Sequence, residues 1–221
     1  MKLLLVLGGS VVATTAMTAT FFDNFNRADA GDLGPNWTNV VGSPSIVNNR
    51  ATAPGEFHNM ALVTGYSDLP QNTLVSMDVF HTSQLVAYAG AVMGYTDNFT
   101  SVFLKVQDNA STGDFNRAFF YLGNNDGGSL LSFADMTPFT SARVYFSFAG
   151  TTATIGVDSN FDMTIDQSFS HDYGTSAFGT GTGLVVYGSA EIDDYMINAV
   201  PEPASLAVLG LGVVALLRRR R

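Results

Sequence analysis

The sequence predicts an all-β fold made of two antiparallel sheets, and three observations lead to this prediction. Apolar and polar residues alternate in several segments, which is the period of a strand with one buried face. Clusters of glycine, asparagine and aspartate separate these segments, as tight turns require. No segment between residues 21 and 199 has a convincing helical period. A long series of short strands without helices is typical of a two-sheet sandwich.

The clearest strands are those with strict alternation, in which the apolar residues form one face. Such segments occur at residues 75–79, 101–107, 143–148 and 152–158. The last two are joined by Ala149-Gly150-Thr151, which indicates a tight hairpin. Further strands are expected near residues 61–64, 85–95, 118–122, 183–187 and 191–197.

Two of the expected strands are apolar on both faces and should therefore lie in the middle of a sheet. They are Leu85–Met93 and Gly183–Tyr187, and the glycines within residues 90–94 predict a bulge or bend. Trp37, the single tryptophan, is expected to pack over one end of the core rather than to stack on a sugar. Other aromatic residues are candidates for outward positions where sugars stack: Tyr66, Tyr88, Phe103 and Tyr145.

The N-terminus has the pattern of a signal peptide over residues 1–19. Lys2 precedes the apolar run Leu3–Leu7, and small residues follow as far as Ala19. Cleavage after Ala16, with the smaller Thr14 at the minus-three position, is preferred; cleavage after Ala19, with Met17 at that position, is the other candidate. The alternative is a buried first strand.

The C-terminal residues 200–221 form a polar signal, an apolar run and a cationic end. The apolar run Ala204–Leu217 would reach about 21 Å as a helix, against about 30 Å for the hydrocarbon core of a bilayer. This single transmembrane helix is therefore marginal, and terminal arginines would keep its end on the cytoplasmic side. The signal residues are Pro201, Glu202, Pro203, Arg218, Arg219, Arg220 and Arg221.

This tail resembles the PEP-CTERM sorting signal of Gram-negative bacteria. The resemblance implies an exosortase partner, a membrane cysteine protease that cuts near the Pro-Glu-Pro. It also implies a producer of extracellular polysaccharide, an inner-membrane-anchored precursor, and a final place at the cell surface or in the extracellular matrix. The alternative is an ordinary anchor that is never cut.

The remaining residues 21–198 have the size of one domain. The chain has no cysteine, which excludes disulfides, thiol catalysis and cysteine-ligated zinc. Of 10 basic and 19 acidic residues, five and 18 lie in this domain, so its net charge is −13. Such acidity argues against nucleic acid as a partner and suits a soluble exported protein.

The domain resembles concanavalin A-like jelly rolls of the laminin-G-like or pentraxin-like type. The matching segments are Asp23–Asp29 with Leu33-Gly34 and Asn36-Trp37, the hairpin of residues 143–158, and the closing strand Ala190–Ile197. The resemblance implies a two-sheet antiparallel jelly-roll sandwich whose first and last strands lie side by side. Pairing of the ends would protect an exposed sheet edge.

The acidic residues near the two ends of the domain suggest a structural calcium ion. If the first and last strands pair, Asp23 could approach Asp193 or Asp194, and calcium prefers oxygen ligands. Asp23 could instead form an ion pair with Arg27 or cap a turn. No cofactor is required by this interpretation.

A catalytic pair of glutamates is not evident. Glu191–Met196 resembles the catalytic strand of β-glucanases, but Met196 stands where the second glutamate is needed. The predicted function is a non-catalytic glycan-binding module of a surface or matrix protein, associated with exopolysaccharide. The alternatives are a glycan hydrolase or lyase on the same fold, and a purely structural or adhesive biofilm protein.

Overall fold

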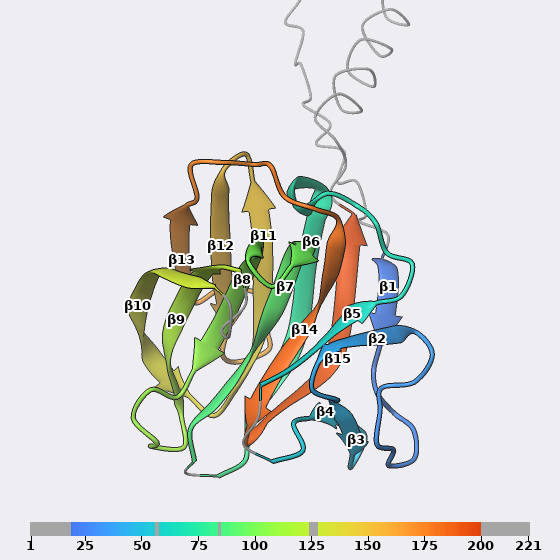
Figure 1. The fold of residues 1–221 in the computed structure, drawn as a ribbon. Helices are drawn as coiled ribbons and strands as arrows, with labels where there is room; N and C mark the ends of the chain where they lie inside the picture. The colour runs from blue at the N-terminus through green and yellow to red at the C-terminus, as the bar shows by residue number, and fades with distance from the viewer. Residues whose placement is uncertain (1–18, 56–57, 84, 124–127, 200–221) are drawn as a thin grey trace, which may run out of the picture.

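The structure is a computed structural model that describes residues 19–55, 58–83, 85–123 and 128–199. Two antiparallel sheets pack face to face, as predicted (Figure 1). Sheet A has the order β13 (Gln167–Asp172), β12 (Thr152–Asp158), β11 (Ser141–Ala149), β6 (Thr73–His81), β15 (Ala190–Ala199), β4 (Arg50–Thr52) and β3 (Ser45–Val47), and β1 (Ala19–Asp23) also pairs with β15.

Sheet B covers one face of sheet A. It has the order β10 (Ser129–Phe139), β9 (Phe115–Leu122), β8 (Thr100–Gln107), β7 (Ala87–Asp97), β14 (Gly181–Gly188), β5 (Asn59–Val63) and β2 (Trp37–Val41). The short 3-10 helix η1 (Pro70–Asn72) precedes β6. Within the described residues, no helix has the length and apolar character that crossing a bilayer requires. The predicted sorting segment and, except for Ala19, the predicted signal peptide lie outside the described residues.

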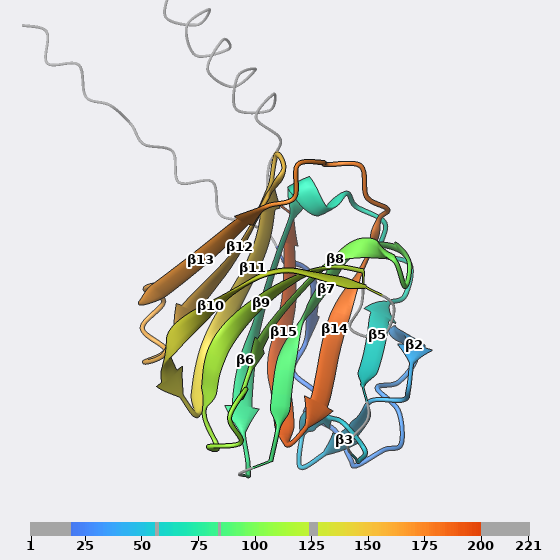
Figure 2. The same ribbon diagram turned by 60° about the vertical axis from the view of Figure 1, so that its left-hand side comes forward.

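The strands predicted from alternation occupy the expected places. The hairpin is formed by β11 and β12, with Ala149 opposite Thr152. The two segments that are apolar on both faces become β7 and β14, which are neighbours in the middle of sheet B. A register shift between Met93 and Asp97 also confirms the bend expected near the glycines of β7. Strands β8, β9 and β10 curve along their length (Figure 2).

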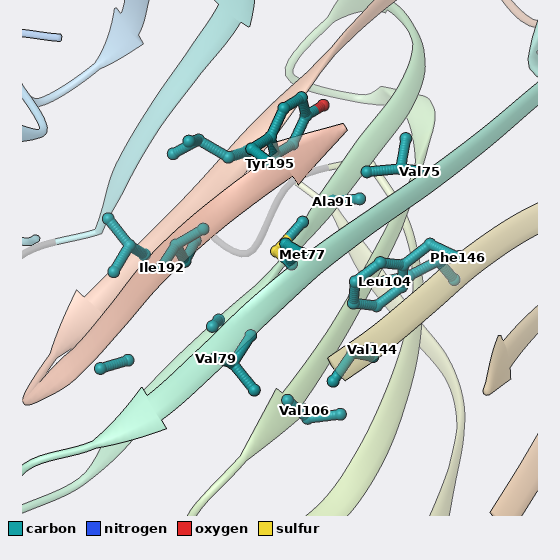
Figure 3. Close-up of a cluster of buried hydrophobic side chains, with 14 of the residues drawn as sticks. Val75, Met77, Val79, Ala91, Leu104, Val106, Val144, Phe146, Ile192 and Tyr195 are labelled. Carbon is teal, nitrogen blue, oxygen red and sulfur yellow. The ribbon is translucent and has the colours of Figure 1, made fainter. Parts of the chain in front are cut away.

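The hydrophobic core lies between the two sheets (Figure 3). Met77 and Val79 of β6 and Phe146 of β11 face Leu104 and Val106 of β8, and all five side chains are fully buried. Because the chain has no disulfide, burial of these apolar side chains, at about 25 cal/mol per Å², must supply the cohesion of the sandwich.

The first and last strands are paired, as predicted. β1 runs antiparallel to the second half of β15, from Ala19 opposite Asn198 to Asp23 opposite Tyr195. The first half of β15 pairs with β4 instead. Trp37 closes this end of the core, with its ring 5.0 Å from that of Tyr195, so the packing interpretation of Trp37 is confirmed.

Candidate functional site

The outer face of sheet B carries a second apolar cluster, separate from the core between the sheets. In β8, Leu104 and Val106 point into the core, so Phe103 and Lys105 point to the outer face. An antiparallel sheet usually has one polar, solvated face, so a cluster on this side is unusual. Its buried members are Met60, Tyr88, Val92, Phe103 and Val185, and its partly buried members are Val40, Val41, Leu62, Tyr95, Tyr121 and Tyr187.

Lys105 lies among aromatic rings in the middle of this face. Its Nζ is 3.9 Å from the ring centroid of Tyr88, 5.0 Å from that of Tyr121 and 5.3 Å from that of Phe119. A cation within about 6 Å of a ring is attracted to the negative face of the π-system. Only 2% of Lys105 is exposed. We name Tyr88, Phe103, Lys105, Phe119, Tyr121 and Tyr187 the aromatic face.

The register of the strands brings these residues together. Lys105 is opposite Phe119 of β9 on one side and opposite Gly90 of β7 on the other. A Cβ at Gly90 would overlap the carbonyl oxygen of Leu104, so only glycine allows β7 and β8 to approach here. The Lys105 side chain therefore lies beside Gly90, a position of β7 that has no side chain.

Two stacked tyrosines form the other part of the aromatic face. Tyr88 of β7 and Tyr187 of β14 are paired across the strands, with ring centroids 4.7 Å apart and ring planes at 7°. The Tyr88 hydroxyl is 2.6 Å from Nδ1 of His58. Tyr187 and Tyr121 are partly exposed. Burial raises the pKa of Tyr121, so its hydroxyl stays protonated and able to donate.

The aromatic face continues to the sheet edge at β10. Phe133 is paired with Phe119, its ring 6.0 Å away, and half of Phe133 is exposed. The Arg117 guanidinium lies 4.6 Å from the Phe133 ring and binds the exposed Asp135 at 2.7 Å. Partly exposed rings with polar groups at their margin suit a ligand that has both apolar and hydroxyl-bearing faces.

The aromatic residues singled out in the sequence lie on different surfaces. Phe103 and Tyr88 belong to the aromatic face. Tyr145 lies in β11 of sheet A, opposite Ser76 of β6. Tyr66 packs against the core, and its hydroxyl is 3.0 Å from Oγ1 of Thr73. Sequence reasoning did not select Lys105, Phe119, Tyr121 and Tyr187; the signal available was the outward phase of their alternating strands.

Asp23, the first predicted calcium ligand, binds hydrogen-bond donors. Its carboxylate accepts bonds from Nη1 and Nη2 of Arg27 at 2.6 and 2.9 Å, from Nε1 of Trp37 at 2.8 Å, and from the Phe25 amide at 2.9 Å. Burial raises the pKa of Asp23, but the hydrogen bonds from these donors outweigh it, so the pKa lies below its ordinary value. The ion pair with Arg27 was the alternative expected from the sequence.

Asp193 and Asp194 lie at a bulge in β15. The register with β6 shifts between Asp193 and Met196, and Asp194 has a φ of 46°, which non-glycine residues rarely adopt. Asp193 is opposite Asp78, which receives two bonds from Arg143, at 2.6 and 2.9 Å. Burial raises the pKa of Asp193, and the charge of Asp194 adds to this.

Pairing of the first and last strands does not by itself assemble a calcium site. In the part of the chain that the structure describes, no three acidic or histidine side chains are grouped so as to hold a metal ion. The donors around Asp23 compete with a cation for the same oxygens. Calcium binding through Asp23, Asp193 and Asp194 stays a prediction.

A family model described as the PEP-CTERM protein-sorting motif matches residues 199–221. The chain thus ends in the sorting motif that the tail residues predicted. No curated protein matches the chain.

Three solved structures illustrate the likeness of the fold. The CBM2 module of the evolved Dit of Lactobacillus casei BL23 phage J-1 is 10% identical, with a TM-score of 0.56 over 82% of this chain and 95% of that one. The VIP36 exoplasmic/lumenal domain in its Ca²⁺/Man3GlcNAc-bound form is 12% identical, with a TM-score of 0.54 over 79% and 88%. A mutant of the GH43 protein BlXynB from Bacillus licheniformis is 11% identical, with a TM-score of 0.55 over 80% of this chain but 39% of that one.

At these identities the likeness shows the fold alone. All three structures match this fold of two antiparallel sheets, with TM-scores of 0.54 to 0.56. The concanavalin A-like jelly-roll sandwich predicted from the sequence is therefore confirmed.

Proposed function

We propose that this chain is an exported, exosortase-processed surface or matrix protein whose sandwich domain binds glycan without catalysis. The binding site is the aromatic face of sheet B, and the ligand is the extracellular polysaccharide of the producing cells. Fold alone does not carry this proposal, because one fold hosts many functions. The observation that carries it is the apolar, tyrosine-bearing outer face of sheet B.

The chemistry of the aromatic face supports a sugar ligand. The C–H faces of a sugar ring pack on flat aromatic rings, and its hydroxyls need hydrogen-bonding partners at the margin. Tyr121 and Tyr187 offer partly exposed rings, and each carries a hydroxyl. Two of the similar structures are a CBM2 module and a domain bound to Man3GlcNAc, which supports the proposal.

Substitutions that remove a tyrosine ring from the aromatic face or from the opposite side of the sandwich test this binding site. Tyr187→Ala and Tyr121→Ala should each weaken binding to polysaccharide from the producing cells about tenfold, or about 1.4 kcal/mol. Each variant loses the apolar area that a ring buries against a sugar, at about 25 cal/mol per Å². Tyr145→Ala on sheet A is the matched control and should bind normally. The measurement is isothermal titration, after thermal unfolding has shown that each variant is folded. If all three variants bind polysaccharide as tightly as the parent protein does, the aromatic face is not the binding site.

Export and processing are tested separately. The protein recovered from the producing cells should lack its signal peptide, and it should end near Pro201–Pro203 when the exosortase is present. Mass spectrometry of both termini measures this. In cells without exosortase, the intact tail should hold the precursor in the membrane.

The second candidate function is glycan hydrolysis on the outer side of sheet A. Asp193 and Asp78 are directly opposite each other, burial raises the pKa of Asp193, and Arg143 binds Asp78. Hydrolysis of a sugar bond uses one protonated and one ionised carboxyl. Release of reducing ends that Asp193→Asn abolishes would establish this alternative. A protein that neither binds nor cleaves any polysaccharide would instead be a structural or adhesive component.

A further inference from the structure

The connection between β7 and β8 presents a phenylalanine to solvent. Phe99 is 69% exposed, although its backbone amide is hydrogen-bonded to Asp97 within the turn. Keeping a large apolar side chain in water is unfavourable by about 25 cal/mol for each Å² that could be buried. A ring held in such a position gains free energy when a ligand covers it.

The turn that carries Phe99 is tied in place. Oδ1 of Asp97 accepts hydrogen bonds from the backbone amides of Phe99 and Thr100, at 2.9 and 2.8 Å. The Tyr95 hydroxyl donates to Oδ1 of Asn98 at 2.9 Å. These contacts hold the backbone of the turn, so the backbone that carries the ring needs little ordering when a ligand binds.

A neighbouring turn supports the same connection. Gly123 has a φ of 78°, and a Cβ at this position would lie 2.6 Å from the Asn98 carbonyl oxygen and 2.9 Å from Cα of Phe99. Its amide donates to the carbonyl of Ser101 at 2.9 Å. The β7–β8 turn is therefore packed against the end of β9 and does not stand alone.

The β7–β8 turn is also continuous with the aromatic face. Tyr95, which binds Asn98 in the turn, packs against the apolar cluster on the outer side of sheet B. The register shift between Met93 and Asp97 bends this end of β7. Figure 2 shows the connection of β7 and β8 reaching away from sheet A, toward the side on which the outer face of sheet B lies.

We infer that Phe99 is a second sugar contact, which makes the site select an extended glycan chain rather than a single sugar. This inference rests on the proposed function. One part of the chain would lie on Tyr121 and Tyr187, and a part further along would stack on Phe99. The ligand class is thus the interior of a polysaccharide, several sugars long.

The test compares glycan length with the site of the substitution. The probes are fragments of the extracellular polysaccharide, sorted into sizes of about two and about eight sugars, and binding is measured by isothermal titration. Phe99→Ala should weaken binding of the long fragments about tenfold and leave binding of the short fragments unchanged. Phe161→Ala, which removes a ring that is 42% exposed in the β12–β13 connection, is the matched control and should change neither.

The outcomes separate this inference from the proposed function. If Tyr187→Ala weakens binding while Phe99→Ala binds long fragments as the parent does, the second contact is wrong and the aromatic face stands. If Phe99→Ala weakens short and long fragments equally, the length selection is wrong. If the parent protein binds no fragment of either size, the proposed function fails, and the inference fails with it.

Discussion

Replacing Asp23 with alanine should destabilise the domain by about 3 kcal/mol. The carboxylate joins β1 in sheet A to Trp37 in sheet B, so its loss affects both sheets. The indole N–H of Trp37 would be left buried without its partner, which costs about 1–3 kcal/mol. The bond to Arg27 contributes about 1 kcal/mol or less, because 38% of the arginine side chain is exposed.

Thermal unfolding measures this loss. For a domain of this size, about 3 kcal/mol corresponds to a fall of about 6–12 °C in Tm. Asp135→Ala is the matched control, since Asp135 also binds an arginine, at 2.7 Å, but is 76% exposed. The control should lower the free energy of unfolding by less than about 1 kcal/mol.

The pH dependence provides an independent check. Because the pKa of Asp23 is below its ordinary 3.8 in the folded protein, its contribution is present above that value and is lost as the pH falls below it. Between about pH 4 and pH 2 the parent protein should therefore lose more stability than Asp23→Ala. Equal slopes for the two proteins would show that the bonds to Arg27 and Trp37 do not stabilise the fold.

Calcium offers the result that would refute this reasoning. The loss in Asp23→Ala should be the same with calcium and with a chelator, because protein donors occupy the Asp23 oxygens. If calcium raises the Tm of the parent but not that of the variant, Asp23 is a metal ligand and the hydrogen-bond assignment is wrong.

Two further predictions concern buried positions. Burial lowers the pKa of His81 below its ordinary 6.5, although Asp108, 3.2 Å away, acts in the opposite direction. The unfolded chain therefore binds the proton more readily than the folded protein does. The contribution of His81 to stability should be complete above about pH 6.5 and decline below it. Urea unfolding at about pH 7.5 and 5 should show this decline, and His81→Gln should reduce it; an unchanged decline would contradict the assignment. Gly90→Ala should lower stability by about 1–3 kcal/mol, because its Cβ would overlap the Leu104 carbonyl oxygen, whereas Gly31→Ala meets nothing within 4 Å. Equal Tm values for these two variants would show that β7 and β8 can separate without cost.

The strands that bury more of their residues were the easier ones to predict from the sequence. β6 and β11 lie inside sheet A, and their apolar residues alternate because one face meets the core. β10 and β13 are edge strands, and the sequence pattern did not indicate them. β13 carries a single apolar residue, Phe169, while β10 exposes Leu130, Leu131 and Phe133 and contains Pro138. An edge strand buries little, so burial imposes little periodicity on its sequence.

The candidate site was predictable only in part, for a related reason. Alternation in β8 places Phe103 and Lys105 on the same side, but it does not reveal which strands lie beside them. The rings around Lys105 come from β7 and β9, and Tyr187 comes from β14, far along the chain. In the same way, the sequence predicted that Asp23 would lie near the last strand, but it could not show that Trp37 would bind the Asp23 carboxylate.

Local pattern alone established the all-β class, the buried faces of the inner strands, the absence of disulfides and the sorting tail, because each depends on neighbouring residues or on composition. The gathering of aromatic rings about Lys105, the partners of Asp23 and the exposure of Phe99 depend on strand order and register. Strand order and register are decided when distant segments pair and the two sheets close over one core. Residues that are near one another in the chain do not encode this pairing.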